Sequence, residues 1–286
     1  MDTVYLNGDF IDKQQASISI LDRGFLFGDG VYEVIPTHNG LTIGAIPHLD
    51  RLNQSLNKIG LEPVLSHKQW QHTLKILQQQ NQLEGQSISF YIQVTRGSTG
   101  FRSHSIPQNP TPTVVAFCMP LKHIDYSKGH KAITLQDTRH DICAIKSINL
   151  LSNILLYQQA QQQGAIEAIL YRNHRIVEGS SSNVFSVHQG IITTPPLEDY
   201  ILAGITRAFT IEAIGQLQLP FEERAIELEE FKQADEIWIT SSSRSLLPIT
   251  LLDNQPVGNG HVGNIIQKVQ KKLSTIQLPR NNNEST

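Results

Sequence analysis

One lysine lies within a stretch of small and apolar residues, CAIKSINLLSN, which spans residues 143–153. Burying an ammonium group in such surroundings costs roughly several kcal/mol unless a partner compensates the charge. The alternative is a surface lysine, whose stem covers apolar neighbours while its amine stays in water. If Lys146 is buried instead, its amine needs a covalent or ionic role, and amine chemistry becomes the first hypothesis.

Two serine-rich turns each follow a short apolar stretch that is typical of a buried strand. In RIVEGSSSNVF, Glu178 precedes Gly179 and residues 180–182, so a carboxylate and several hydroxyl groups gather at one strand end. In IWITSSSRSLLP, the serines at 241–243 precede Arg244. Hydroxyl groups at the carboxyl end of a strand suit a phosphate or another polar ligand. Ordinary serine-rich turns are the alternative for both segments.

A third polar segment, LAGITRAF, combines a glycine with the expected start of a helix. Gly204 permits close backbone approach, and the N–H groups of Ile205 and Thr206 open the helix. Free N–H donors and the positive end of the helix dipole form a favourable site for an anion such as phosphate. Capping of the helix by the Thr206 side chain is the alternative.

Taken together, these segments offer a phosphate site, a carboxylate and a lysine. This combination meets the needs of pyridoxal 5′-phosphate (PLP). The aldehyde of PLP condenses with a lysine amine, its phosphate needs several donors, and its ring nitrogen needs an acidic partner. The sequence therefore predicts PLP chemistry, with Lys146 and Glu178 as the central residues.

The bulk composition is that of an ordinary globular protein. The 286 residues accommodate one large domain or two medium ones, and 39% of them are hydrophobic. The net charge of −3 gives no indication of a nucleic-acid partner, and no apolar run is long enough for a transmembrane helix. The N-terminus lacks a signal-peptide core, and Cys118 and Cys143 match no zinc or redox spacing, which favours the cytoplasm. The eleven scattered histidines predict no metal site.

Periodicity and turn residues predict a mixed α/β (α+β) chain. Hairpin turns are expected at Asn7–Gly8, at Asn39–Gly40 and around Gln189–Gly190. The hydrophobic spacing predicts helices at 47–60, 67–80, about 149–163, about 204 to before Pro220, and about 262–274. The expected strands are 87–97, 111–120, 131–136, 166–171, 174–177 and 236–240.

The elements divide into two expected domains. Residues 120–129 are polar and are bounded by Pro120 and Gly129, which is typical of a linker. The expected organisation is an N-terminal α/β domain at 1–121, a linker at 122–129, a C-terminal α/β domain at 130–276 that carries the lysine, and a disordered tail at 277–286.

The chain resembles the class IV (fold type IV) PLP-dependent aminotransferases from about residue 3 to residue 275. The segments that carry the resemblance are DRGFLFGDGVYEVI, HLDRL, QVTRG, IKSINLL, AILYRN, VEGSSSNVF and GITR. The lysine segment and EGSSSNVF, at their separation, are the most specific of these motifs. The resemblance implies the two-domain architecture of fold type IV, with PLP as the cofactor.

The resemblance also implies roles for individual residues. Lys146 matches the lysine that forms a Schiff base with PLP, and Glu178 matches the carboxylate that pairs with the pyridine nitrogen. Leu202 falls where a leucine packs against the cofactor ring. Tyr32 matches the active-site tyrosine, with Glu33 beside it. Cofactor phosphate contacts are implied for Arg51, Ile205, Thr206 and Ser242, and Ser241 is a further cofactor-binding candidate.

Substrate choice is implied by the loop GSTGFRSHSIP. D-amino-acid transaminases of this family carry an Arg-x-His pair in this loop, and Arg102 and His104 fit its spacing. With the tyrosine, that pair binds the substrate α-carboxylate, whose two oxygens match a guanidinium. A solvated basic loop is the alternative. In the family the loop reaches the neighbouring subunit's cofactor, so a homodimer is implied. The loop is longer than in near relatives, and SSSRS departs from the usual pattern, which leaves the substrate range open.

The implied reaction is a ping-pong transamination between a D-amino acid such as D-alanine and a 2-oxo acid such as 2-oxoglutarate, which gives pyruvate and D-glutamate. Branched-chain L-amino-acid transaminase, amine transaminase and aminodeoxychorismate lyase are alternatives, because they share Lys146 and Glu178. A non-catalytic PLP-binding protein is a further alternative, against which the intact Lys146–Glu178 pair argues. No nucleic-acid or membrane partner is expected.

Overall fold

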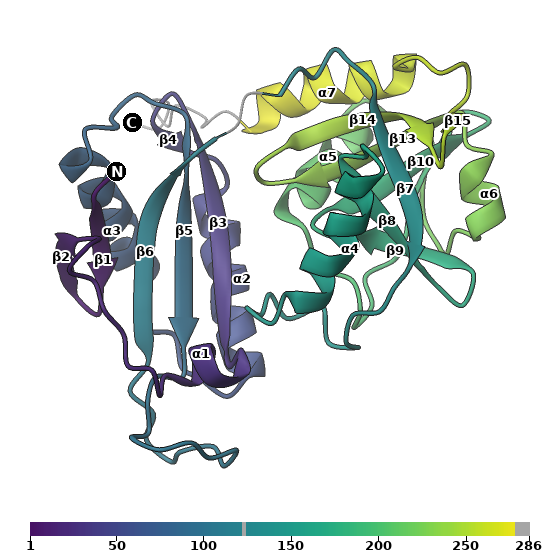
Figure 1. Ribbon diagram of the computed structural model, residues 1–286. Coiled ribbons are helices and arrows are strands. Elements are labelled where there is room, and N and C mark those ends of the chain that lie inside the picture. Colours follow the sequence, from purple (N-terminus) through teal and green to yellow (C-terminus); the bar gives the residue numbers. More distant parts are fainter. Residues whose placement is uncertain (122–123, 278–286) are drawn as a thin grey trace. The chain divides into compact units, whose positions relative to one another are not determined.

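The computed structural model describes residues 1–121 and 124–277, which form two compact units (Figure 1). The first unit contains residues 1–121 and 145–149, and the second contains residues 124–144 and 150–277. Each unit has a β-sheet with helices packed against it, so the expected mixed α/β class is confirmed. The expected linker residues 122 and 123, and residues 278–286 of the expected tail, lie outside the described residues.

The first unit is built on a six-stranded sheet with the order β2-β1-β6-β5-β3-β4. Its strands are β1 (Thr3–Leu6), β2 (Asp9–Asp12), β3 (Gly30–His38), β4 (Leu41–Thr42), β5 (Ile88–Thr95) and β6 (Thr113–Pro120). Neighbouring strands pair antiparallel throughout. The hairpin predicted at Asn7–Gly8 is confirmed, with positive φ angles of 51° and 111°. The turn predicted at Asn39–Gly40 is confirmed in the same way.

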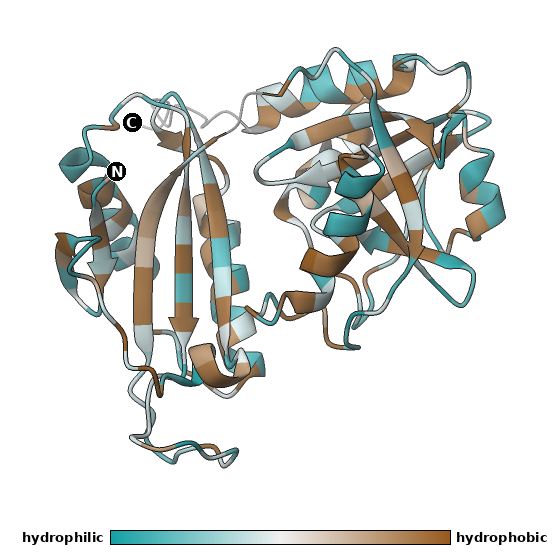
Figure 2. Cartoon of the chain, in the orientation of Figure 1, coloured by the Kyte–Doolittle hydropathy of each residue, from teal (hydrophilic) through white to brown (hydrophobic). Residues whose placement is uncertain are grey.

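Three helices belong to the first unit: α1 (Arg23–Phe27), α2 (Ala45–Lys58) and α3 (His67–Gln80). Helix α3 begins with a capping box between Ser66 and Gln69, and its bounds are those predicted from the hydrophobic spacing. Helix α2 packs on β3, and α3 packs on β1 and β6. Their apolar faces are fully buried, and Figure 2 shows brown colour along the strands that these helices cover.

The second unit contains a nine-stranded sheet with the order β12-β11-β10-β13-β14-β7-β8-β9, and β15 pairs with β14. Its strands are β7 (His130–Gln136), β8 (Glu167–Arg172), β9 (Arg175–Gly179), β10 (Asn183–His188), β11 (Ile191–Thr194), β12 (Phe221–Glu223), β13 (Glu236–Ser241), β14 (Ser245–Leu252) and β15 (Gln255–Pro256). Strand β14 was not predicted, because Pro248 argues against a central strand. In the structure Pro248 lies opposite Trp238 within the sheet.

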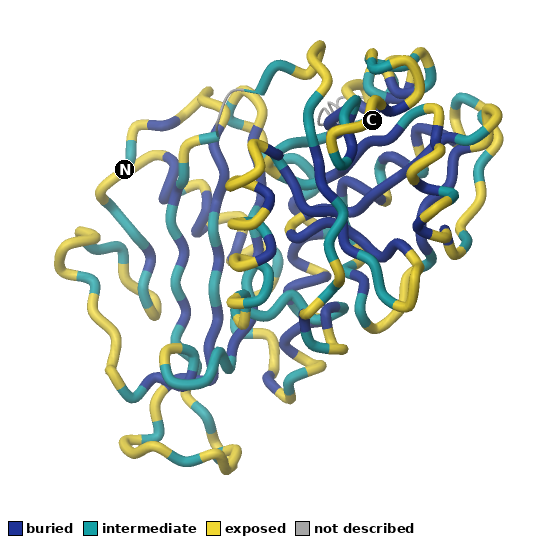
Figure 3. Tube along the Cα trace, turned by 45° about the vertical axis from the view of Figure 1, so that its right-hand side comes forward, coloured by how far each residue is buried: buried dark blue, intermediate teal, exposed yellow. Residues whose placement is uncertain are grey.

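The helices of the second unit are α4 (Leu151–Gln162), α5 (Ile205–Gln216), α6 (Leu228–Lys232) and α7 (Asn264–Gln277). Helix α4 packs on β7 and β8, whereas α5 and α7 pack on each other and on β13. Figure 3 shows that burial is concentrated along the strands of this sheet. Within the described residues, every helix is too short or too polar to cross a membrane.

The lysine segment at residues 145–149 lies in the first unit, which differs from the domain expected to carry it. Its backbone pairs with the start of β3. The Tyr32 N–H donates to the Lys146 carbonyl at 3.0 Å, and the Ile148 N–H donates to the Gly30 carbonyl at 3.1 Å. Backbone pairing across more than one hundred residues cannot be inferred from local periodicity, which explains the difference.

Candidate active site

Lys146 and Tyr32 lie against each other in the first unit. Lys146 is half-buried, and its Nζ lies 4.1 Å from the centroid of the Tyr32 ring. No carboxylate among residues 1–121 and 124–277 forms an ion pair with this amine. An ammonium is attracted to the face of an aromatic ring, but far more weakly than to a buried carboxylate. The amine is therefore positioned by its neighbours and left without an anionic partner that would block covalent chemistry.

Next to this pair, β3 and α2 together form a buried acid–base cluster. Arg51 donates through Nε to Glu33 Oε1 at 2.7 Å and through Nη2 to Glu33 Oε2 at 2.9 Å. His48 Nδ1 lies 2.7 Å from Glu33 Oε2. Burial alone raises the pKa of Glu33, but the Arg51 charge and the two hydrogen-bond partners outweigh burial and lower this pKa to about 2. Glu33 is thus a carboxylate that orients the Arg51 guanidinium.

The lysine segment is anchored to the same helix. The Lys146 N–H donates to Ser55 Oγ at 3.4 Å, and Ser55 lies one helical turn after Arg51. The Lys146 charge also contributes to lowering the pKa of His48, after the larger effect of burial. The structure therefore brings together three of the predicted site residues in the first unit: Tyr32, Arg51 and Lys146.

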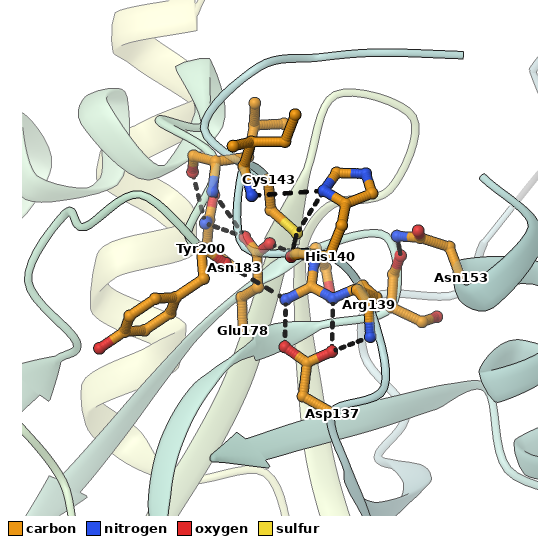
Figure 4. A network of polar contacts seen from close by, with 12 residues as sticks. Asp137, Arg139, His140, Cys143, Asn153, Glu178, Asn183 and Tyr200 are labelled. Atoms are coloured by element: carbon orange, nitrogen blue, oxygen red, sulfur yellow. Dashed lines mark hydrogen bonds and ion pairs between the residues drawn. The ribbon is translucent and has the colours of Figure 1, made fainter. Parts of the chain in front are cut away.

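In the second unit, Glu178 is the centre of a buried polar network (Figure 4). Arg139 Nη1 donates to Glu178 Oε1 at 2.5 Å, and Glu178 Oε2 accepts from Asn183 Nδ2 at 3.1 Å and from the Leu202 N–H at 3.0 Å. Glu178 is 4% exposed. Burial raises the pKa of Glu178 to about 7, against the opposing effect of Arg139. A buried carboxylate at this position can accept a hydrogen bond from a partner that carries a proton, such as a pyridine nitrogen.

Sequence reasoning missed Arg139, which is the main cationic partner of Glu178. Arg139 also donates through Nε and Nη2 to the two oxygens of Asp137, each at 2.9 Å. Burial alone raises the pKa of Asp137, but hydrogen bonds from Arg139 and Arg172 outweigh it and lower this pKa. The segment QDTRHD contains a signal, since Asp137 and Arg139 follow a predicted strand at i and i+2. Asp137 thus fixes the plane of the guanidinium that faces Glu178.

Helix α5 begins without a side-chain cap. Gly204 is the N-cap residue, and its backbone lies too close to Asn183 for any side chain. A Cβ atom at this position would lie 1.9 Å from Asn183 Oδ1. Among the described residues, the N–H groups of Ile205 and Thr206 have no hydrogen-bond acceptor. The alternative in which Thr206 caps the helix is therefore wrong. Two backbone donors at the positive end of a helix are left for an anion.

The end of β13 carries further hydroxyl groups. Asn183 of β10 pairs with Thr240 of β13, and Ser241 is the next residue after Thr240 and the last of β13. The Oγ atom of Ser241 is buried and has no partner in the part of the chain that the structure describes. A buried hydroxyl without a partner costs free energy unless a ligand satisfies it. Ser242 is half-buried and has a partner of its own within the protein.

The serines after Glu178 serve a second buried acid. The hydroxyl groups of Ser180, Ser181 and Ser182 all donate to the Glu167 carboxylate, which is fully buried. Arg244 completes the group, with its Nη1 at 3.3 Å from Glu167 Oε2. The alternative of an ordinary serine turn is thus partly correct, since these hydroxyls point to Glu167. Arg244 explains the unusual SSSRS segment as the cation for this acid.

The residues present fit PLP. Unpartnered donors at the start of α5 and at Ser241 suit its phosphate, and Glu178 suits its protonated ring nitrogen. The backbone of Leu202 is held beside Glu178. Its N–H donates to Glu178, and its carbonyl accepts from Asn183 Nδ2 at 2.8 Å. Taken by itself, the first unit has a lysine amine, that of Lys146, with no carboxylate partner among the described residues. This donor set is the one that a phosphorylated aldehyde requires.

The two cationic candidates of the substrate loop meet at one ring in the first unit. The Arg102 guanidinium lies 5.1 Å from the centroid of Phe27, and the His104 ring lies 5.2 Å from the same centroid. Both side chains are exposed. The structure thus gives Arg102 and His104 a common neighbour, Phe27.

Comparisons with known proteins show the family of the chain. The sequence model of the family Amino-transferase class IV matches residues 30–252. The chain belongs to this family. The D-alanine aminotransferase of Bacillus licheniformis is 38% identical over 272 residues, which cover 94% of this chain and 95% of that protein. The D-alanine aminotransferase of Staphylococcus aureus (strain COL) is 37% identical over 276 residues, with coverages of 95% and 96%.

The fold of this class IV aminotransferase is also that of solved structures. The branched-chain amino acid aminotransferase of Escherichia coli superimposes with a TM-score of 0.90 at 22% identity, over 96% of this chain and 94% of that one. At this identity the likeness concerns the fold alone. The expected fold type is confirmed by this likeness, and the expected dependence on PLP is confirmed by membership of the class IV family.

Proposed function

We propose that this class IV aminotransferase transfers an amino group between a D-amino acid and a 2-oxo acid, with D-alanine and 2-oxoglutarate as the pair that gives pyruvate and D-glutamate. The observation that carries this proposal is the gathering of Arg102 and His104 on the Phe27 ring. The D-alanine aminotransferases named above support the proposal, because the sequence of each aligns with nearly the whole chain.

Lys146 and Glu178 have the central roles in the proposed reaction. PLP, when bound, supplies an aldehyde that bonds to an amine and a ring that accepts electrons from the substrate α-carbon. Lys146 would hold the cofactor through its Nζ, and its amine would take up and return the proton of the substrate α-carbon. Glu178, held by Arg139, would pair through its carboxylate with the protonated ring nitrogen.

The remaining contacts orient the two ends of the cofactor. The N–H groups of Ile205 and Thr206 and the hydroxyl groups of Ser241 and Ser242 bind the phosphate in this proposal, and Arg51 adds a positive charge. The Glu33 carboxylate holds the Arg51 guanidinium in one orientation. Leu202 packs against the ring in this proposal. Its backbone is held in place by hydrogen bonds with Glu178 and Asn183.

Substrate recognition rests on the α-carboxylate. Arg102 offers a planar pair of donors, His104 offers a third, and Tyr32 offers its hydroxyl group. A carboxylate held in one place fixes which face of the α-carbon is presented to Lys146, so these residues set the preference for D- over L-amino acids. An amine substrate without a carboxylate would lose this orientation.

We also propose a homodimer in which the loop with Arg102 and His104 serves the partner's site. Apolar side chains on and near the loop support this: Ile20, Phe101 and Ile106 are each more than 60% exposed. Exposed apolar groups of this size are typical of surfaces that a second chain covers. A cytoplasmic location stays a prediction, and it is consistent with two buried cysteines that are not disulfide-bonded.

A half-reaction screen tests the substrate class. The PLP-loaded protein is mixed with D-alanine or L-leucine, one at a time, and the cofactor absorbance is followed before 2-oxoglutarate is added. We expect D-alanine to convert the cofactor and 2-oxoglutarate to restore it. Turnover of L-leucine alone would contradict the D-amino-acid assignment and favour a branched-chain transaminase, and conversion of an amine without a carboxylate would favour an amine transaminase.

A hybrid experiment tests the shared site. We expect Lys146→Ala chains and Arg102→Ala chains to be inactive or weakly active alone, whereas their mixed dimers would contain one site with both native residues. We expect partial recovery of activity after mixing. No recovery, with mixed dimers demonstrated, would show that Arg102 acts within its own chain.

A further inference from the structure

Helix α1 and the loop between β5 and β6 are joined by one buried arginine. Arg23 is 5% exposed, and its Nη1 donates to the Ser103 carbonyl at 2.6 Å and to the Ser105 carbonyl at 3.2 Å. Its Nε donates to Asp29 Oδ2 at 2.8 Å. A buried guanidinium is tolerated only when its donors are satisfied, so Arg23 is committed to these partners. It therefore holds the loop backbone on both sides of His104.

The two ends of the loop are tied to the same helix. The Arg23 N–H donates to the Gly97 carbonyl at 2.9 Å, where the loop begins. Asp22, the N-cap residue of α1, accepts from Thr95 Oγ1 at 3.0 Å and from Thr113 Oγ1 at 2.6 Å. These threonines end β5 and begin β6, on either side of the loop. Helix α1 thus fixes where the loop leaves the sheet and where it returns.

The side chains that point from the loop rest on the other end of α1. The Phe27 ring carries the Arg102 guanidinium at 5.1 Å and the His104 ring at 5.2 Å, and Arg23 lies 5.0 Å from the same centroid. Among the described residues, Arg102 and His104 have no other side-chain contact of this kind and no carboxylate partner. Their orientation therefore depends on Phe27, while their polar atoms stay available.

We propose that Arg23 and Phe27 are positioning residues for substrate recognition. Arg23 fixes the backbone at residues 103 and 105, and Phe27 fixes the two side chains that bind the substrate carboxylate. This inference rests on the proposed role of Arg102 and His104. Donors that are already oriented bind a carboxylate without the entropic cost of ordering an exposed loop. The segment DRGFLF, which had no role in the reaction, thus sets how firmly the carboxylate is held.

Steady-state kinetics of the PLP-loaded enzyme test this. For Arg23→Met, we expect the KM for D-alanine to rise about tenfold, because charged hydrogen bonds to two loop carbonyls are lost. For Phe27→Leu, we expect a rise of about threefold, because the ring that holds both cations is lost. The kcat changes much less in both variants. Arg23→Lys, which keeps the charge and part of the donor set, falls between wild type and Arg23→Met.

Matched controls use residues of the same type outside the loop contacts. Phe25 lies on the same helix and is 72% exposed, so Phe25→Leu should leave the KM unchanged. Arg175 forms an ion pair with Glu227 on the surface of the second unit, so Arg175→Met should also leave it unchanged. If these controls raise the KM as much as Arg23→Met and Phe27→Leu do, the proposal is overturned.

A double-variant test separates positioning from general destabilisation. In an Arg102→Ala/His104→Ala background, Phe27→Leu should have no further effect on KM, since the side chains that it positions are gone. An undiminished effect in that background would overturn the proposal. If Arg102→Ala/His104→Ala itself leaves the KM for D-alanine unchanged, the proposed carboxylate site fails instead.

Trypsin gives a readout that is independent of catalysis. Cleavage after Arg102 requires the loop to open, and Arg23→Met should speed this cleavage several-fold while Arg175→Met does not. Equal cleavage rates in wild type and Arg23→Met would show that Arg23 does not hold the loop. This result would contradict the proposal even if the carboxylate role of Arg102 were correct.

Discussion

Arg139 and Glu178 form a buried ion pair in the second unit, with Arg139 Nη1 at 2.5 Å from Glu178 Oε1 (Figure 4). The arginine is itself held by both oxygens of Asp137. The pair has one cation between two acids, so burial is only partly compensated at Glu178. The pKa of Glu178 therefore lies at about 7.

This pKa predicts how cofactor binding depends on pH. Above about pH 7 the Glu178 carboxyl group is ionised and pairs with a protonated ring nitrogen, whereas below that value it becomes neutral and the attraction is lost. We expect the affinity for PLP to fall as the pH drops through this value. Absorbance titrations one unit above and one unit below it measure the change. The PLP phosphate also titrates in this range, so Glu178→Gln is the control, and a pH dependence that persists unchanged in it would contradict the assignment.

Arg139→Met should weaken cofactor binding at neutral pH. Without its arginine, Glu178 loses the interaction that opposes burial, and its pKa rises further, so the carboxylate is scarce. We expect the Kd for PLP to increase at least about tenfold, which corresponds to about 1.4 kcal/mol. Titration by fluorescence or absorbance gives the Kd, and Arg175→Met serves as the control. An unchanged Kd would show that Arg139 is structural only.

The low pKa of Glu33 predicts that this residue makes the free energy of unfolding of the cofactor-free protein depend on pH in the acid range. Its pKa of about 2 lies below the ordinary value of 4.5, so its stabilisation is complete above about pH 4.5 and is lost as the pH falls toward about 2. We expect Glu33→Gln to cost about 3 kcal/mol at neutral pH, because the buried Arg51 guanidinium loses the negative charge of the Glu33 carboxylate. The difference from wild type in urea unfolding should shrink in acid. Glu227→Gln, at an exposed ion pair, should cost under about 1 kcal/mol, and an equal cost would contradict the prediction.

Ser241 predicts a difference between PLP and pyridoxal, which lacks the phosphate. The buried Ser241 hydroxyl has no partner among the described residues and is proposed to donate to the phosphate. Ser241→Ala should therefore raise the Kd for PLP about three- to tenfold while leaving that for pyridoxal unchanged. Ser243 is exposed in the same turn, so Ser243→Ala is the matched control. Equal effects on both ligands would place Ser241 away from the phosphate.

Local patterns predicted the elements whose signals are contained in a few residues. The hairpin at Asn7–Gly8 and helix α3 both follow from turn or capping residues and periodic apolar positions. Strand β14 was missed, because Pro248 lies where a ladder donor is expected. Residues 145–149 were expected in the C-terminal domain, whereas they belong to the first unit. Their place depends on backbone pairing with β3, which is remote in sequence.

The amino-acid sequence by itself determined the chemistry, because PLP requires a lysine, an acid and phosphate donors, and these residue types stand in recognisable motifs. Only the tertiary structure decided the partners of these groups: Arg139 for Glu178, Glu33 for Arg51, and Tyr32 for Lys146. The physical reason is that a charge or pKa depends on burial and on neighbours a few ångströms away. Folding brings those neighbours from distant parts of the chain, and no local spacing encodes them.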